Sequence, residues 1–146
     1  MSAAPDPAEL DALATCLVLN TVRAARALTR RYDARLAPHG VTVAQFAALG
    51  ALRASPGGTV SELAERSATD RSTLSRNLDL MARRGWVAKR PGVRGNALTC
   101  DLTPEGEALL DRLVPLWREA QEEMRAHLAG HDADAYLAML RRMTEI

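Results

Sequence analysis

Apolar residues recur at helical spacing through most of the chain, and prolines and glycines divide this pattern into separate segments. Residues 9–36 are predicted to form one long helix, because leucines and alanines return every three or four positions along one stripe. That stripe comprises Leu10, Leu13, Leu17, Ala24 and Leu28. Residues 1–7 are typical of a frayed terminus, and the Pro-His-Gly sequence at residues 38–40 ends the helix.

Three shorter helices are predicted next, from the residues that would cap their N-termini. In a capping box, a Thr hydroxyl accepts a hydrogen bond from a backbone N–H and a Gln or Glu three residues later reaches back. The caps are Thr42 with Gln45 before residues 43–53, Thr59 with Glu62 before residues 60–67, and Asp70 before residues 71–84. Residues 55–58 (Ser-Pro-Gly-Gly) form a turn after the first of these helices, and Gly85 ends the third because glycine adopts the left-handed conformation cheaply.

The C-terminal half is predicted to contain a β-hairpin and two further helices. The expected elements are strands at residues 86–90 and 97–102, a long helix over residues 104–128 and a last helix over residues 132–144. Thr103 followed by Pro104 is a strong start for the long helix, because a proline at the first helical position loses no hydrogen bond. Pro115 is expected to kink that helix. The fold class is therefore mainly α, with a central unit of about 45 residues between two helical arms that are too apolar to remain exposed.

Composition fits a single globular domain spanning residues 1–146. Apolar residues make up 47% and charged residues 25%, which is close to the average for soluble proteins and excludes a disordered chain. No run of 18 apolar residues and no secretory signal occurs, so a cytoplasmic protein without a membrane partner is expected. The sequence contains no glycine-rich phosphate loop, nucleophile elbow or paired-carboxylate motif, so neither an enzyme nor a cofactor is expected.

The predicted helix over residues 71–84 has two chemically different faces. At 100° per residue, Leu74, Leu78 and Met81 fall on one narrow apolar face. The opposite sector carries Ser72, Ser75, Arg76, Asp79 and Arg83. Short hydroxyl side chains allow close approach to base edges, and arginine suits guanine or phosphate. With the short turn at residues 68–70, this favours a helix-turn-helix that binds the major groove; the alternative is an ordinary amphipathic helix with a solvated polar face.

Charge distribution agrees with a DNA-binding centre. The whole chain carries a net charge of +1, but residues 59–103 hold eight basic and five acidic side chains, while the rest is acidic. Such a concentration of positive charge favours contact with a polyanion. In the hairpin, Arg90, Arg94 and Asn96 are placed to reach the minor groove or the backbone. The alternative is a surface hairpin with incidental arginines.

Five segments in this order and spacing resemble the MarR (multiple antibiotic resistance regulator) family of winged-helix transcriptional regulators. They are LAPHGVTVAQF (36–46), TVSELAER (59–66), DRSTLSRNLD (70–79), RGWV (84–87) and LTPEG (102–106). The resemblance implies a homodimer held by residues 9–36 and 104–146, and a winged helix-turn-helix with a small β-hairpin wing at residues 43–103. It implies binding of double-stranded DNA at a near-palindromic operator, through Arg71, Ser72, Thr73, Ser75, Arg76 and Asn77. It also implies a repressor that a small-molecule effector releases from DNA.

The predicted wing departs from the family pattern. Family members usually carry an Asp-x-Arg or Asp-Arg-Arg signature six to eight residues before the Leu-Thr pair, where this chain has Arg94, Gly95 and Asn96. The family aspartate braces a wing arginine, and this chain lacks it. A winged helix that serves as a protein-interaction module, with impaired DNA binding, is therefore an alternative function.

Cysteine and histidine supply two further candidate sites. Cys16 lies roughly where peroxide-sensing relatives carry a reactive cysteine, so a thiol-based redox-sensing regulator is another alternative. Its helical spacing beside leucines instead favours a buried, inert thiol, and Cys100 in a wing strand has the same interpretation. His127 and His131 are four residues apart, but Gly130 is expected to end the helix between them, so no metal site is predicted.

A candidate effector pocket is drawn from the two arms and the first helix of the central unit. Its residues are Leu17, Asn20, Phe46 and Trp117. Asn20 lies near the apolar stripe of the first helix, where it could orient an effector, fix the dimer register or face solvent. Trp117 lies in a stretch of the long helix that is apolar on more than one side, which favours either a dimer core or part of a pocket.

Overall fold

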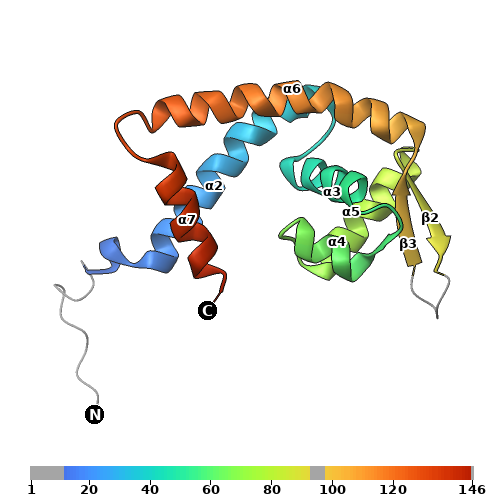
Figure 1. Cartoon of the computed structure of the whole chain (residues 1–146), viewed down its shortest axis with the longest axis horizontal. Coiled ribbons are helices and arrows are strands. Elements are labelled where there is room, and N and C mark those ends of the chain that lie inside the picture. The colour runs from blue at the N-terminus through green and yellow to red at the C-terminus, as the bar shows by residue number, and fades with distance from the viewer. Residues whose placement is uncertain (1–11, 93–97, 146) are drawn as a thin grey trace, which may run out of the picture.

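The protein is an arch whose top is a single long helix. The computed structural model describes residues 12–92 and 98–145, and in it α6 (Pro104–His127) spans the top of the arch (Figure 1). Helices α2 (Leu17–Leu36) and α7 (Ala133–Met143) form an arm under one end. The segments from α3 to β3 form a winged-helix unit under the other end. The mainly α architecture is as predicted.

The N-terminal helix is shorter than the apolar stripe predicts. A 3₁₀ turn, η1 (Ala12–Thr15), is followed by Cys16 in an extended conformation (φ −62°, ψ 121°), and α2 begins only at Leu17. The amide of Asn20 donates hydrogen bonds to the carbonyl oxygens of Ala14 (2.8 Å) and Cys16 (2.9 Å), which stabilises the break. The continuous helix expected over residues 9–36 is therefore wrong for residues 12–16, and residues 9–11 lie outside the described part.

The end of α2 follows the prediction. A 3₁₀ turn, η2 (Ala37–His39), is followed by Gly40 with a positive φ of 69°. Asp33 accepts a hydrogen bond from the backbone N–H of Val43 (2.6 Å), so the end of α2 also holds the start of the next helix. This connection places α2 directly against the winged-helix unit.

The three helices of the winged-helix unit begin at their predicted caps. They are α3 (Val43–Ala54), α4 (Val60–Arg66) and α5 (Arg71–Arg83). Both capping boxes are complete, with Thr42 accepting from the N–H of Gln45 and Thr59 accepting from that of Glu62. Asp70 caps α5 by accepting from the N–H of Thr73 at 2.8 Å. Gly85 follows α5 with a φ of +76°, as predicted.

The wing is a three-stranded antiparallel sheet rather than a hairpin alone. Strands β2 (Val87–Pro91) and β3 (Leu98–Leu102) pair as expected. A two-residue strand, β1 (Gly58–Thr59), adds to the other edge of β3, giving the order β1-β3-β2. This strand was not predicted, because two residues carry no alternation pattern and their pairing partner is about 40 residues away in the chain. The carboxylate of Asp101 accepts from the N–H of Gly57 (2.6 Å), which secures the turn before it.

The core lies between α3, α4, α5, the inner face of the sheet and the first half of α6. Its largest fully buried side chains are Leu36, Leu49, Leu52, Leu63, Leu74, Leu78, Met81, Cys100, Leu110 and Leu113. The predicted apolar face of α5 therefore packs into the interior. Helix α6 continues as one helix through Pro115, and Gly130 (φ 88°) separates it from α7. Within residues 12–92 and 98–145, no helix combines the length and apolarity needed to cross a membrane.

Candidate nucleic-acid interface

Helix α5 carries the six side chains that were predicted to contact DNA, and three of them are exposed. Arg71, Ser72 and Arg76 are exposed, whereas Thr73, Ser75 and Asn77 are half-buried. The buried and exposed residues alternate around the helix because Leu74, Leu78 and Met81 anchor the opposite face in the core. The six candidate residues therefore lie together on one rigid helix, over its first two turns.

Asp70 organises the N-terminus of this helix. Its carboxylate accepts hydrogen bonds from the hydroxyl of Ser72 (2.7 Å) and the backbone N–H of Thr73 (2.8 Å). These hydrogen bonds hold the pKa of Asp70 well below its usual range, and the hydrogen bond from Ser72 has the largest effect. The side chain of Arg76 lies over the same turn, with its guanidinium donating to the hydroxyl of Thr73 (3.4 Å). The first turn of α5 is thereby preorganised, with two guanidinium groups exposed beside it.

The wing contributes two basic residues of β2 to this surface: Arg90, which was predicted to contact DNA, and Lys89, which was not. Arg90, in β2, is exposed, whereas Arg94 and Asn96 lie outside the described residues. Lys89 forms an ion pair with Asp79 of α5. The position of Lys89 two residues after the buried Val87 was the available signal, because alternate residues of a strand share a face.

Arg84 is a second basic residue whose side chain contacts other residues of the protein. Its guanidinium donates to the carbonyl oxygen of Gly40 (2.5 Å) and lies 5.0 Å from the ring centre of Trp86. Lys89 and Arg84, which the charge count between residues 59 and 103 includes, are thus bound to other elements of the fold. Arg71, Arg76 and Arg83 of α5, Arg66 of α4 and Arg90 of β2 are exposed and can face a ligand.

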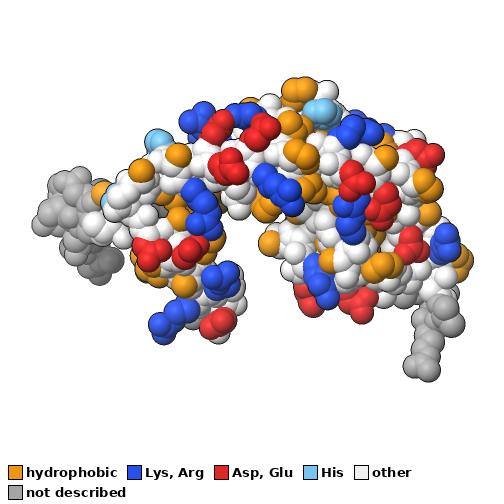
Figure 2. All heavy atoms as spheres, turned by 45° about the horizontal axis from the view of Figure 1, so that its top comes forward, with side chains coloured by type: hydrophobic (Ala, Val, Ile, Leu, Met, Phe, Trp, Pro, Cys, Tyr) orange, Lys and Arg blue, Asp and Glu red, His pale blue; other side chains and the backbone are white. Residues whose placement is uncertain are grey.

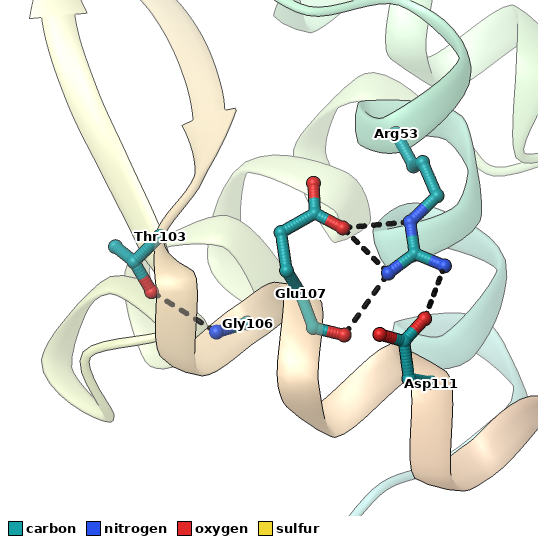
Figure 3. Close-up of polar contacts among 5 residues, drawn as sticks. All are labelled: Arg53, Thr103, Gly106, Glu107 and Asp111. Atoms are coloured by element: carbon teal, nitrogen blue, oxygen red, sulfur yellow. Dashed lines mark hydrogen bonds and ion pairs between the residues drawn. The ribbon is translucent and has the colours of Figure 1, made fainter.

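The winged-helix unit is joined firmly to α6 (Figure 3). Arg53 of α3 binds Glu107 through its Nε (2.7 Å to Oε2) and also donates to the backbone oxygen of Glu107 (3.0 Å). The remaining guanidinium nitrogen of Arg53, Nη1, lies 2.8 Å from Oδ1 of Asp111. The hydroxyl of Thr103 accepts from the N–H of Gly106 (3.1 Å) and donates to the carbonyl oxygen of Gly85 (2.6 Å). The start of α6 is thus bonded both to α3 and to the residue that ends α5.

The four candidate pocket residues fall into two groups. Phe46 of α3 and Trp117 of α6 stack with ring centres 6.2 Å apart. Leu17 and Asn20 lie in the first turn of α2, at the opposite end of that helix from α3, and Leu17 is 72% exposed. A separate apolar groove of about 400 Å³ runs between α2, the end of α6 and α7, and includes Leu28. This groove has no signal in the sequence, because α7 folds back only after the turn at Gly130.

The cysteines have different environments. Cys16 is half-buried at the N-terminus of α2, so the expectation of a buried thiol at this position is wrong for the single chain. Cys100 is fully buried as expected, and burial raises the pKa of its thiol. His127 is the last residue of α6, and the chain turns before His131, so the two imidazoles do not share a helix. Within the described ranges, no three potential metal ligands lie together.

Comparison with known proteins assigns this architecture to a family. Residues 39–95 match the sequence model of the MarR family. The chain is 31% identical to the transcriptional repressor NicR of Pseudomonas putida, over 72% of this chain and 67% of NicR. It is 38% identical to the Mycobacterium tuberculosis transcriptional regulator MosR in a structure of its DNA complex, with a TM-score of 0.76 over 89% of this chain and 96% of MosR. Streptomyces coelicolor PcaV, solved with its natural ligand, is 26% identical with a TM-score of 0.75, over 99% of this chain and 98% of PcaV. The chain belongs to the MarR family of winged-helix, DNA-binding transcriptional regulators.

Proposed function

We propose that the protein is a homodimeric repressor that inserts α5 into the major groove of a near-palindromic operator and leaves the DNA when a small molecule binds. The observation that carries the DNA-binding role is the division of α5 into two faces. Leu74, Leu78 and Met81 are fully buried, while Arg71 and Arg76 project into solvent from the same helix. Guanidinium groups on a helix anchored in this way suit guanine edges and phosphates.

The exposed apolar surface of the arm supports the homodimer. The exposed apolar residues are Leu13, Leu17, Val18, Leu19 and Val22 at the start of the arm, and Leu137, Met139 and Met143 in α7. None of the residues of α7, all of which are described, is buried. A single chain therefore leaves an amphipathic helix with its apolar side in water, which a second copy of the same arm would cover.

Small-molecule response is supported by a hollow in the arch and by the relatives. Figure 2 shows the hollow between the arm and the winged-helix unit. The stacked rings of Phe46 and Trp117 lie where α3 meets α6. An aromatic or apolar effector with one polar group is the chemistry that such a surface would bind. PcaV, which is similar in fold, was solved with its natural ligand.

Selection of duplexes from a randomised library tests the DNA-binding role. The wild-type protein is expected to enrich a near-palindromic sequence, and Arg76→Ala is expected to weaken binding of that duplex by about 1–3 kcal/mol without unfolding the protein. Arg112→Ala removes the same charge from an exposed position on α6 and serves as the control. Enrichment of no sequence, or equal effects of the two substitutions, would contradict the proposal.

Sedimentation tests the dimer independently of DNA. Val18 is 69% exposed in the arm, and Val18→Glu is expected to shift the protein from dimer to monomer because a charge would be buried in the interface. Leu98→Glu makes the same kind of change at an exposed apolar residue of β3 and is expected to leave the dimer intact. A monomeric wild-type protein at micromolar concentration would refute this part of the proposal.

A further inference from the structure

A lysine occupies the inner face of the wing. Lys89 lies two residues after the buried Val87 in β2 and stands opposite Cys100 of β3, which is fully buried. Residues that are paired across strands or separated by two positions point to the same side of a sheet. The side chain of Lys89 accordingly is only 23% exposed. A charge held at the edge of a core is unfavourable unless an opposite charge compensates it.

Asp79 of α5 provides that charge. Its carboxylate binds the ammonium group of Lys89, and this hydrogen bond lowers the pKa of Asp79. Asp79 is 52% exposed and shares the outward sector of α5 with Ser75 and Arg83. An acidic side chain on a surface that meets DNA opposes binding through repulsion of phosphate. Its presence there therefore calls for a compensating role.

We propose that Asp79 and Lys89 are a positioning pair, which fixes the angle between α5 and β2 so that the helix and the wing meet one duplex together. The pair connects the middle of α5 to β2 at Lys89, the residue directly before Arg90. A change in the geometry of the pair would therefore change the direction of β2 relative to α5. Neither Asp79 nor Lys89 contacts DNA in this role. The inference rests on the proposed DNA-binding face of α5.

A positioning role and a simple charge effect predict opposite signs for one variant. If Asp79 acts only as a negative charge near DNA, Asp79→Asn should strengthen binding of every duplex. If Lys89 is a phosphate contact, Lys89→Gln should weaken binding of every duplex and reduce the salt slope by about one. If the two residues position the wing, both substitutions should weaken binding of the selected duplex, while binding of a scrambled duplex remains equal or improves.

Fluorescence anisotropy of the full-length protein with two probes separates these cases. The probes are the duplex that the wild type selects from a randomised library and a scrambled duplex of equal length. We expect Asp79→Asn and Lys89→Gln each to weaken selected binding by about 10-fold or more, on the scale of one misplaced base contact. The double variant should be no weaker than either single variant, because both remove the same interaction. Lys89→Arg, which keeps a cation within reach of Asp79, should retain selective binding.

Two matched controls set the scale of pure charge effects. Glu65→Gln removes an exposed acid from α4, outside the proposed contact set, and should change binding of both duplexes slightly and equally. Arg90→Gln removes an exposed cation next to Lys89 and should weaken both duplexes with a smaller salt slope. Thermal unfolding of each variant confirms that it is folded. If Lys89→Gln does not fold, the sign of the Asp79→Asn effect on binding still distinguishes the positioning role from a charge effect. The side chain of Asp79 is half exposed, so this substitution leaves the core intact.

The outcomes distinguish the inference from the function on which it rests. Stronger binding of both duplexes by Asp79→Asn, or additive losses in the double variant, would overturn the positioning role and leave the DNA-binding function standing. Failure of the wild type to select any duplex would overturn the proposed function and this inference with it. Selective loss in both single variants, restored by Lys89→Arg, would establish the pair.

Discussion

Gly106 offers a direct test of how tightly α6 is joined to the winged-helix unit. It lies in the first turn of α6, where alanine would normally favour the helix over glycine by about 0.5–1 kcal/mol. A Cβ atom at this position would stand 2.1 Å from the carbonyl oxygen of Trp86 and 3.0 Å from its carbonyl carbon. Both obstacles are backbone atoms, so no side-chain rotation relieves the clash. Gly106→Ala is therefore expected to destabilise the protein despite its better helix propensity.

The size of the effect follows from what must move. Relieving the clash requires a shift of about 1 Å or more to reach an ordinary separation between non-bonded atoms. That shift would strain the bond from the N–H of Thr103 to the oxygen of Trp86 (3.1 Å) and that from the hydroxyl of Thr103 to Gly85 (2.6 Å). Overpacking costs about 1–3 kcal/mol and each strained hydrogen bond about 1 kcal/mol, against a propensity gain of about 1 kcal/mol. We expect a net loss of about 2–4 kcal/mol.

Urea unfolding followed by circular dichroism measures this loss, and Gly50 supplies the control. Gly50 lies inside α3, and a Cβ atom there would meet nothing within 4 Å. Gly50→Ala should therefore stabilise the protein by about 0.5–1 kcal/mol, the gain expected for alanine in an unobstructed helix. If Gly106→Ala matched Gly50→Ala in sign, the close docking of α6 on the α5–β2 connection would be refuted.

Three further predictions concern the caps and the thiols. Thr42→Ala should cost about 1 kcal/mol in urea unfolding, because it removes half of a complete capping box, and an unchanged midpoint would contradict the cap. The lowered pKa of Asp70 stabilises the fold fully above its ordinary value of 3.8 and progressively less below it, so wild type and Asp70→Asn should converge in stability upon acidification; a constant difference would refute this. A thiol reagent should modify Cys100 only upon unfolding, and peroxide should leave DNA affinity unchanged; modification of Cys100 in the native protein would contradict its burial, and loss of affinity would favour redox sensing.

Sequence alone predicted the elements whose signals are local. The capping boxes at Thr42 and Thr59 each involve residues three apart, and the structure confirms both. The apolar face of α5 was equally predictable, because helical periodicity alone brings its residues to one side. The local signal failed at Cys16, where the apolar stripe continues but the chain leaves the helix. There the amide of Asn20 bonds two preceding carbonyl oxygens, an alternative to helix that periodicity does not register.

The parts of the site that sequence could not predict depend on contacts between distant segments. A charge count treats Lys89 and Arg84 as equal to Arg76, yet the first pairs with Asp79 and the second binds Gly40, 44 residues earlier in the chain. Only the fold shows which basic side chains are bound to another segment of the protein. The meeting of Phe46 and Trp117, which are 71 positions apart, belongs to the same category.

Helix α6 connects the arm and the winged-helix unit mechanically. Near its start it is bonded to α3 through Arg53. Further along, Gln121 accepts a hydrogen bond from Tyr32 of α2, and Arg35 of α2 pairs with Glu119 and Glu123.

The stacked pair of Phe46 and Trp117 lies between these two sets of bonds along α6. Because α6 is unbroken, the loosening of one loop would not accommodate a ligand that separates the two rings. If the helices rather than the ring torsions respond, α6 rotates relative to either α3 or α2. Rotation relative to α3 would strain the bonds of Arg53 and the docking of Gly106 on Trp86, and so would displace the end of α5. The same close docking that makes Gly106→Ala costly is therefore what would carry a change at the rings to α5, the helix proposed to bind DNA.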